Sequence, residues 1–297
     1  MANSKRHSGP QLACEITADR VIAARATDDG TSLESFTSRS LPAGAVVPHL
    51  SEANLGNAAA VQQAVSDALS TVGARSKDLV AILPDAAVRV ALLEFDTLPD
   101  KKADADGMIR FRLKKALPFD VERAAISYDI HRSDGKVRVV AAVMVANVLA
   151  EYESLFRDLG YAPGVVLPSS LASLANVQES DPVMVIKSDS NTTSMSIVGG
   201  GELLLFRILE NTGGMAPGVD QLADDVHASM VFFEDTYQTR PGRVLLGGLL
   251  DADALGAELQ DHVGTRVQPL VASSTIGSVR PNFPASALAG VTGALLG

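Results

Sequence analysis

The stretch from residue 80 to residue 130 decides the fold of this chain. It opens with VAILPDAAVRVALLEFDTLP (80–99), continues with MIRFRLKKALPFD (108–120) and ends in AAISYDI (124–130). The apolar runs that end in Leu-Pro are typical of buried strands followed by turns. The charged part has apolar residues at helical spacing and stops at Pro118, which cannot continue a helix. No catalytic constellation lies in this stretch, which favours an interaction module.

The segments on either side of this module repeat each other. Each starts with a meander of three short strands and continues into a helix and a further strand, which is an internal repeat of supersecondary structure. Before the module we expect strands at 12–16, 21–26, 32–38 and 79–83, with a helix from Asn57 to Gly73. After it we expect strands at 183–186, 194–198, 203–209 and 243–246 and near Val267, with helices at about 219–237 and 251–262.

A hairpin and two helices are expected between the module and the second repeat. Strands at 124–130 and 136–145 form the hairpin. Asn147 has a side chain suited to capping the helix that follows, and Gly160 ends that helix. A strand through 165–167 then leads into a short helix at 169–177.

Composition excludes several classes of protein. The 297 residues are 46% hydrophobic but only 4% aromatic, so the core is expected to consist of Ala, Val, Leu and Ile. A net charge of -10 argues against a nucleic-acid binder. The single cysteine, Cys14, rules out an internal disulfide framework and fits a reducing compartment. The longest apolar run, 137–146, is far shorter than the ~20 residues of a membrane span, so we expect a soluble cytoplasmic protein without direct membrane insertion.

The order of these segments resembles the actin-like ATPase superfamily, whose ribonuclease H-like halves are duplicated. Within it the chain is similar to the PilM family of type IV pilus machines and to the cytoplasmic part of GspL from type II secretion. The specific cues are the two Leu-Pro strand ends, the helix that runs into 117–120, and Ser127-Tyr128. The resemblance implies an α/β fold with an inserted subdomain of the FtsA/PilM type. It divides the chain into a first half at 1–80, completed by about 275–297, an insert at 81–165, and a second half at 166–274 with a reduced lid.

The resemblance also places vestigial nucleotide-binding motifs, but two of the three are altered. Glu15 keeps the acid of the first phosphate motif, but Thr17 replaces its glycine, which lets the backbone approach phosphates. In the second motif, which runs to Thr192, Lys187 replaces the magnesium-ordering aspartate and Asp189 replaces a glycine. The adenosine motif matches at Gly247-Gly248, although a glycine pair there is also typical of a tight strand-to-helix turn.

Phosphoryl transfer depends on positioning and metal electrostatics, and a lysine cannot hold magnesium. We therefore expect no enzymatic activity and no cofactor, with ATP or ADP binding possible but disfavoured. The alternative is an active actin-like ATPase whose motifs have diverged. The histidines show no metal-ligand spacing, so no metal site is expected.

The expected function is that of a scaffold, and the resemblance implies the partner. PilM-like proteins bind the cytoplasmic N-terminal peptide of PilN, a bitopic inner-membrane protein, in a groove between the first subdomain and the insert. Such a partner would place this chain at the inner membrane, beside other components of a pilus or secretion machine. The expected contacts combine basic and apolar side chains at the end of the module's helix, where the basic face could also be merely solvated. They are Arg110, Leu113, Lys114, Leu117, Pro118 and Phe119.

Overall fold

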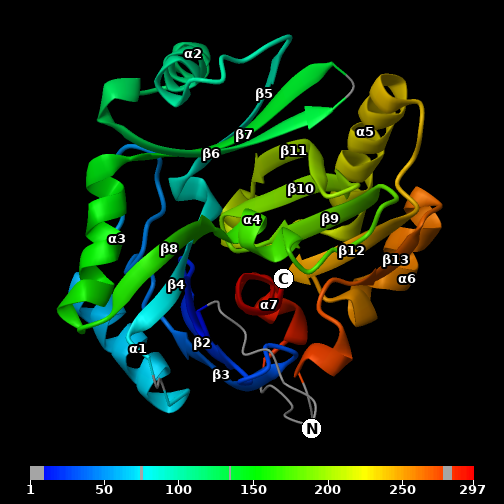
Figure 1. Ribbon diagram of the computed structural model, residues 1–297. Coiled ribbons are helices and arrows are strands. Elements are labelled where there is room, and N and C mark those ends of the chain that lie inside the picture. Colours follow the sequence, from blue (N-terminus) through cyan, green and yellow to red (C-terminus); the bar gives the residue numbers. More distant parts are fainter. Residues whose placement is uncertain (1–9, 74–75, 134, 277–282) are drawn as a thin grey trace, which may run out of the picture.

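Two sheets with the same strand order form the body of the protein, as the computed structural model shows for residues 10–73, 76–133, 135–276 and 283–297 (Figure 1). The first sheet has the order β3-β2-β1-β4-β8 and the second the order β11-β10-β9-β12-β13. The first contains β1 (Leu12–Ile16), β2 (Arg20–Ala26), β3 (Leu33–Ser40), β4 (Asp78–Leu83) and β8 (Ala162–Pro168). The second contains β9 (Val183–Ser188), β10 (Thr192–Gly199), β11 (Glu202–Glu210), β12 (Arg243–Gly248) and β13 (Arg266–Pro269).

The internal repeat expected from the sequence is confirmed. In each half an antiparallel meander pairs through its first strand with a parallel strand, β1 with β4 and β9 with β12. A second parallel strand then forms the sheet edge, β8 in the first half and β13 in the second. The fold is therefore the expected α/β architecture of duplicated halves.

The insert is a small sheet covered by one helix. Its strands β5 (Arg89–Phe95), β6 (Ala124–Ser133) and β7 (Lys136–Val145) have the order β5-β7-β6, and α2 (Lys102–Lys114) packs on one face. The face beneath α2 is apolar because alternate residues of β7 point the same way. The insert core includes Ile109 and Leu113 from α2 and Val139, Ala141 and Val143 from β7.

The expected insert boundaries, 81–165, are too wide. Helix α3 (Ala146–Asp158) packs into the core of the first half, and β8 pairs in parallel with β4 of the first sheet. The second half accordingly begins after β8 and not at residue 166. The expected capping role of Asn147 is also wrong, because β7 runs directly into α3 and the N-cap position is Val145, which has no capping side chain.

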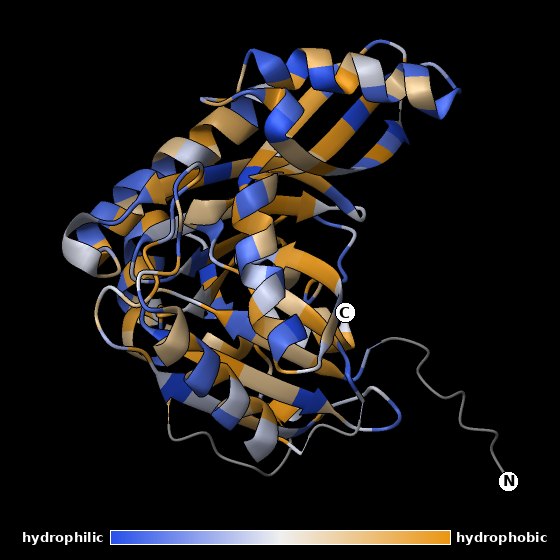
Figure 2. Ribbon diagram, turned by 90° about the vertical axis from the view of Figure 1, so that its left-hand side faces the viewer, coloured by the Kyte–Doolittle hydropathy of each residue, from blue (hydrophilic) through white to orange (hydrophobic). Residues whose placement is uncertain are grey.

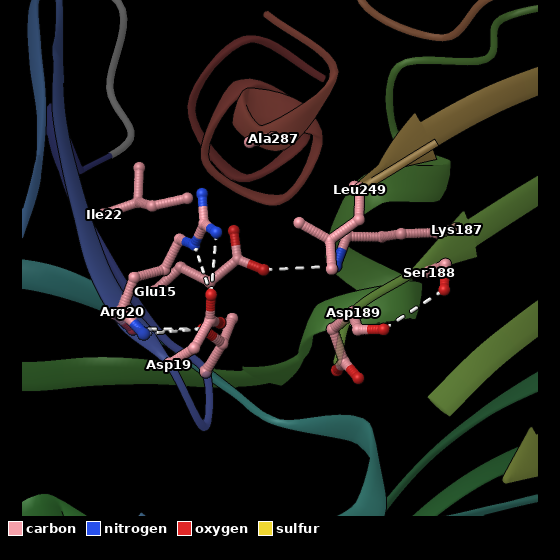
Figure 3. A pocket seen from close by; sticks show the side chains of 11 residues that line it. Glu15, Asp19, Arg20, Ile22, Lys187, Ser188, Asp189, Leu249 and Ala287 are labelled. Carbon is pink, nitrogen blue, oxygen red and sulfur yellow. Dashed lines mark hydrogen bonds and ion pairs between the residues drawn. The ribbon is translucent and has the colours of Figure 1, made fainter. Parts of the chain in front are cut away.

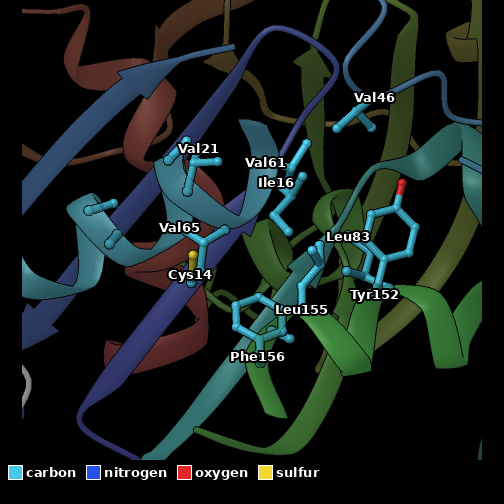
Figure 4. Packing of buried hydrophobic residues seen from close by; sticks show 14 of the residues in the cluster. Cys14, Ile16, Val21, Val46, Val61, Val65, Leu83, Tyr152, Leu155 and Phe156 are labelled. Atoms are coloured by element: carbon cyan, nitrogen blue, oxygen red, sulfur yellow. The ribbon is translucent and has the colours of Figure 1, made fainter. Parts of the chain in front are cut away.

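The core of the first half lies between its sheet and the helices α1 (Ala58–Thr71) and α3 (Figure 4). Tyr152 and Phe156 of α3 are fully buried there, in the same cluster as Cys14. The Tyr152 hydroxyl donates to Asn54 Oδ1 at 3.0 Å. The Glu151 carboxylate accepts the backbone N–H groups of Asn54 and Leu55 at 2.8 and 3.0 Å, which holds the loop before α1 against α3.

Two helices lie between the sheets and join the halves. They are α4 (Ser169–Leu174) and α7 (Ala289–Leu296), and their side chains share one core with strands of both sheets. Figure 1 shows α7, in red, between the first and second sheets. The outer face of the second sheet is covered by α5 (Val219–Tyr237) and α6 (Ala252–Val263). The chain's last helix thus packs on the first strands, which places the strand ends of both sheets around one central site.

Candidate functional site

The ends of three strands meet between the two halves. Glu15 lies near the end of β1, Lys187 near the end of β9, and Gly248 ends β12, and all three line the same pocket (Figure 3). The β1–β2 turn contributes Thr17 and the β9–β10 turn contributes Asp189. Residues of the two altered phosphate motifs thus line one pocket.

A buried ion pair occupies this position. Lys187 Nζ lies 3.2 Å from Glu15 Oε1, and the two side chains are 3% and 1% exposed. The Ser169 hydroxyl, at the start of α4, contacts both the Lys187 ammonium and Glu15 Oε1. Burial opposes the charge on Lys187, but the carboxylates of Glu15, Asp85 and Asp189 outweigh it, so the pKa of Lys187 is raised. The ammonium therefore stays protonated and is unsuited to act as a general base.

Asp85 adds a second buried carboxyl close to the ion pair. It lies in the short 3-10 turn η1 (Asp85–Ala87) after β4, where it accepts the backbone N–H of Ser170 at 2.9 Å and the Ser170 hydroxyl at 2.7 Å. Burial raises the pKa of Asp85 to about 6, with Lys187 opposing and Asp189 adding to the shift. No local pattern in the sequence singles out Asp85, Ser169 or Ser170. Their link to Glu15 and Lys187 arises only where β4, β8 and β9 are brought together.

The space left around the ion pair is very small. The pocket lined by Glu15, Thr17, Lys187 and Asp189 has a cavity volume of about 20 Å³. That volume holds roughly one water molecule. Ligand pockets are typically about 300–1,000 Å³. Side chains of the protein itself thus fill most of the space between these strand ends.

The residues that the resemblance places in the nucleotide motifs make hydrogen bonds within their own turns. Thr17 Oγ1 donates to Asp19 Oδ1 at 2.9 Å within the β1–β2 turn. Asp189 Oδ1 accepts the backbone N–H groups of Asn191 and Thr192 at 2.7 Å each, which closes the β9–β10 turn. Thr192 is buried and borders a different pocket, between η1 and β11.

Close packing explains why positions 247 and 248 are both glycines. Gly248 has φ +71°, and a Cβ there would lie 2.0 Å from the carbonyl oxygen of Ser188, so only glycine fits without a backbone shift. A Cβ at Gly247 would lie 3.2 Å from Ala289 of α7 and 3.1 Å from Leu270. Both positions serve the tight end of β12 and the packing of α7. Among the described residues no cluster of His, Cys, Asp and Glu suits a metal ion.

A second pocket lies between the insert and the first half. Its cavity volume is about 150 Å³, and its lining is almost entirely apolar. Two edge strands border it, β6 of the insert and β8 of the first sheet. The main lining residues are Ala125, Ile126 and Ser127 from β6, Ala142 and Met144 from β7, Leu149 from α3, and Val166, Leu167 and Pro168 from β8.

The second pocket is called the groove below. The expected partner-binding residues do not line it. Leu113 is fully buried in the insert core, and Arg110 donates to the carbonyl of Val121. Lys114 is exposed on α2, on the opposite face of the insert sheet from Ala142 and Met144. The remaining three residues lie on the segment after α2. Leu117 and Phe119 are partly buried, and Phe119 packs against both the insert core and the first-half core. Pro118 borders the pocket between η1 and β11.

Comparison with solved structures identifies the architecture. The PilM-PilN type IV pilus biogenesis complex matches with a TM-score of 0.79 at 18% identity, over 97% of this chain and 98% of the other. The chain has an actin-like fold. The cytoplasmic domain of EpsL, an inner-membrane component of the type II secretion system of Vibrio cholerae, matches with a TM-score of 0.55 at 10% identity over 95% and 93% of the two chains. The ethanolamine utilization protein EutJ of Carboxydothermus hydrogenoformans matches with a TM-score of 0.53 at 11% identity, over 98% of this chain and 92% of the other.

These likenesses confirm the resemblance and the fold expected from the sequence. The agreement extends over nearly the whole chain in each case, which includes the insert. No protein-family model and no curated protein sequence matches the chain. Within the described residues, no helix has the length and apolar character needed to cross a membrane.

Proposed function

We propose that this protein is a scaffold component on the cytoplasmic side of a type IV pilus or related secretion machine. The observation that carries the proposal is a contrast between two sites. The nucleotide position is filled by the Lys187–Glu15 pair, while an apolar groove stays open between the insert and the first half. The shared architecture with the PilM component of a pilus complex supports the machine assignment.

The proposed partner is the cytoplasmic N-terminal peptide of a bitopic, PilN-like inner-membrane protein. A peptide bound in the groove would meet two strand edges whose backbone groups lack a neighbouring strand, β6 and β8. An extended segment can add to such an edge, and alternate side chains then enter the apolar pocket. This attachment would make the protein peripheral at the inner membrane.

The proposal includes the absence of ATP turnover. The protonated Lys187 stands beside Glu15, and a magnesium ion at this position would need oxygen ligands and would be repelled by the ammonium. Thr17 and Asp189 are engaged in closing their own turns. The competing candidate is an active ATPase, whose only support is the fold shared with actin-like proteins.

The test is a titration of labelled N-terminal peptides from the bitopic membrane proteins encoded beside this chain. Ser127 is exposed and lines the groove, so Ser127→Arg places a long charged side chain in the apolar site without disturbing a core. We expect peptide affinity to fall at least tenfold, since a desolvated charge at the centre of an interface is strongly unfavourable. Ser70→Arg, at an exposed position of α1, is the matched control and should bind like the wild type.

Two further variants locate the peptide. Lys114→Glu changes the α2 surface outside the groove, so a slower association in this variant alone would place the peptide on α2. Phe119→Ala removes a side chain shared by the insert core and the first-half core. It should weaken peptide binding by ~1–3 kcal/mol if Phe119 anchors the peptide. If no peptide binds the folded wild type, the scaffold proposal fails.

A further inference from the structure

The insert and the second half meet through charged side chains near the tips of two hairpins. One hairpin is β6–β7 of the insert, and the other is β10–β11, where Glu202 directly follows the turn. The Arg138 guanidinium of β7 donates to Glu202 Oε2, and His131 Nδ1 of β6 lies 3.4 Å from Glu202 Oε1. One carboxylate of the second half thus contacts two strands of the insert.

The insert residues of this contact form one row across the insert sheet. Arg138 pairs with Glu94 of β5 on one side and with His131 of β6 on the other. Directly opposite residues in neighbouring strands project from the same face of a sheet. Arg138 Nε lies 3.7 Å from Glu94 Oε1, and the guanidinium lies 5.6 Å from the ring centre of Tyr237, the last residue of α5. We call Glu202, Arg138, His131 and Glu94 the clasp.

No apolar core joins the two parts that the clasp holds together. Among the described residues, the core of the insert and the core of the second half share no member, whereas Phe119 packs against both the insert core and the first-half core. Strands β5 and β11, together with η1 and the loop before α1, instead border a cleft of about 460 Å³. Val90 of β5 and Phe206 and Ile208 of β11 line this cleft. Because apolar side chains that face open space gain little packing energy, charged contacts hold this side of the insert.

The chain itself joins the insert only to the first half. Strand β5 follows β4 through η1, and β7 runs directly into α3. The clasp lies toward the other end of β7, since Arg138 and Val145 are seven residues apart, about 23 Å at 3.3 Å per residue. Figure 1 shows the β6–β7 hairpin reaching from α3 toward α5, and in Figure 2 α2 lies along the top edge, outside the insert strands. The insert is thus held by the chain at one end and by the clasp near the other.

We infer that the clasp is releasable and that it sets the position of the insert against the second half. Partly exposed ion pairs contribute little net stability, because water solvates the separated charges well. Polar interfaces between parts of one chain permit those parts to move relative to each other. On release the insert stays attached through its chain connections and through Phe119. It then turns as one sheet away from β11, which widens the cleft.

The clasp also acts on the groove, a consequence that rests on the proposed function. On β6, Ser127 lines the groove, and His131, four residues further on, belongs to the clasp. On β7, Ala142 and Arg138 stand in the same relation. Residues an even number apart in a strand point to the same face, so groove and clasp lie on one face of the insert sheet. The groove exists in the clasped position, and release should therefore weaken peptide binding.

The test measures the distance between the insert and the second half by pulsed electron paramagnetic resonance. Spin labels are attached at two exposed positions, Lys136→Cys near the tip of β7 and Ala228→Cys on α5. Cys14 is fully buried, so the labels attach only to the introduced cysteines. The intact clasp should give one narrow distance distribution. In Glu202→Gln a longer distance should appear, with the ratio of open to closed molecules rising about fivefold. Salt at 1 M, where the screening length is about 3 Å, should act in the same direction.

Further variants separate a releasable clasp from a contact that only stabilises the fold. Arg138→Gln removes the other side of the main contact and should produce the same longer distance. The double variant Glu202→Gln, Arg138→Gln should open little further than either single variant, because both changes remove one shared contact. Glu234→Gln is the matched control, since it removes the same charge from an ion pair with Arg240 that does not involve the insert. This control should leave the distance distribution unchanged.

The clasp is refuted if folded Glu202→Gln keeps the wild-type distance distribution, or if Glu234→Gln changes the distribution equally. Unfolding of both Glu202→Gln and Arg138→Gln, seen by circular dichroism, would also refute it, because the contact would then be required for the fold itself.

Peptide titration is a separate readout. In Glu202→Gln the peptide affinity should fall in proportion to the fraction of clasped molecules. An unchanged affinity beside a changed distance would refute the link between clasp and groove. If no peptide binds the wild type, the proposed function fails, whereas the distance measurement still decides whether the clasp releases.

Discussion

Lys187 lies with its ammonium 3.2 Å from the Glu15 carboxylate, and the two residues come from equivalent strands of the two halves, β9 and β1. The pair thus bridges the two halves of the protein at the ends of these strands. The second oxygen of Glu15 is buried without a hydrogen-bond partner among the described residues. It faces Gly290 of α7, where a Cβ would approach it to 2.4 Å. The contacts of the Glu15 carboxylate with Lys187 and Ser169 are both made through its other oxygen, Oε1.

Removing one member of this pair should destabilise the protein strongly. Lys187→Met leaves Glu15 buried with an uncompensated charge, which costs about 3–5 kcal/mol of unfolding free energy. The double variant Glu15→Gln, Lys187→Met should recover much of that loss, because it removes the Glu15 charge together with its partner. Chemical denaturation of the wild type, Lys187→Met, Glu15→Gln and the double variant measures both effects. Additive losses would show that the two side chains do not interact.

Magnesium-ATP should neither be hydrolysed nor bound tightly. At 1 mM ATP, a Kd of 1 mM or weaker raises the unfolding free energy by about 0.4 kcal/mol or less. Calorimetric titration and a thermal shift with ATP measure this directly. Steady phosphate release that disappears in Glu15→Ala would favour the ATPase alternative. A submicromolar affinity would refute the weak-binding part on its own.

The stability of the protein should depend on the protonation of Asp85. Burial is the main reason that its folded-state pKa, about 6, is raised above the ordinary value of 3.8. Between these pH values the folded state holds a proton that the unfolded state releases, so this group's contribution to stability falls as pH rises from about 4 to 6. The difference between the two pKa values corresponds to roughly 3 kcal/mol of unfolding free energy.

Asp85→Asn tests this contribution by replacing the carboxyl with a neutral amide that can still accept the Ser170 N–H. The unfolding free energy of this variant should be less pH-dependent between pH 4 and 7 than that of the wild type. Asp158→Asn, at an exposed position of α3, is the control for the loss of one carboxylate. Parallel pH profiles for the wild type and Asp85→Asn would contradict the prediction.

Cys14 should be inert in the folded protein. Its thiol is fully buried in β1, and burial, together with the neighbouring Glu15 charge, raises its pKa far above the ordinary value. The thiolate is the reactive form, so a disulfide reagent should modify Cys14 only after unfolding. Absorbance of the released thiol, with and without denaturant, measures the reaction. Rapid stoichiometric modification of a protein that keeps its native circular dichroism would disprove the burial.

The sequence by itself determined the elements and their repetition. The helix expected at 219–237 is α5 to the residue, since its apolar stripe, exposed acidic face and preceding Gly218 are all local signals. The strands of both meanders and the insert were likewise visible, because period-two patterns and Leu-Pro ends act within a few residues. The expected N-cap at Asn147 failed for a local reason, the direct passage of β7 into α3.

Only the tertiary structure decided which segments share a site. Ser169 and Glu15 are 154 positions apart and Lys187 and Glu15 are 172 apart, so no local pattern links them. The groove likewise depends on β6 and β8 being edge strands, which is a property of strand order and not of composition. Side-chain chemistry fixes local conformation through nearest neighbours along the chain, whereas a buried charge finds its partner only when distant strands pack.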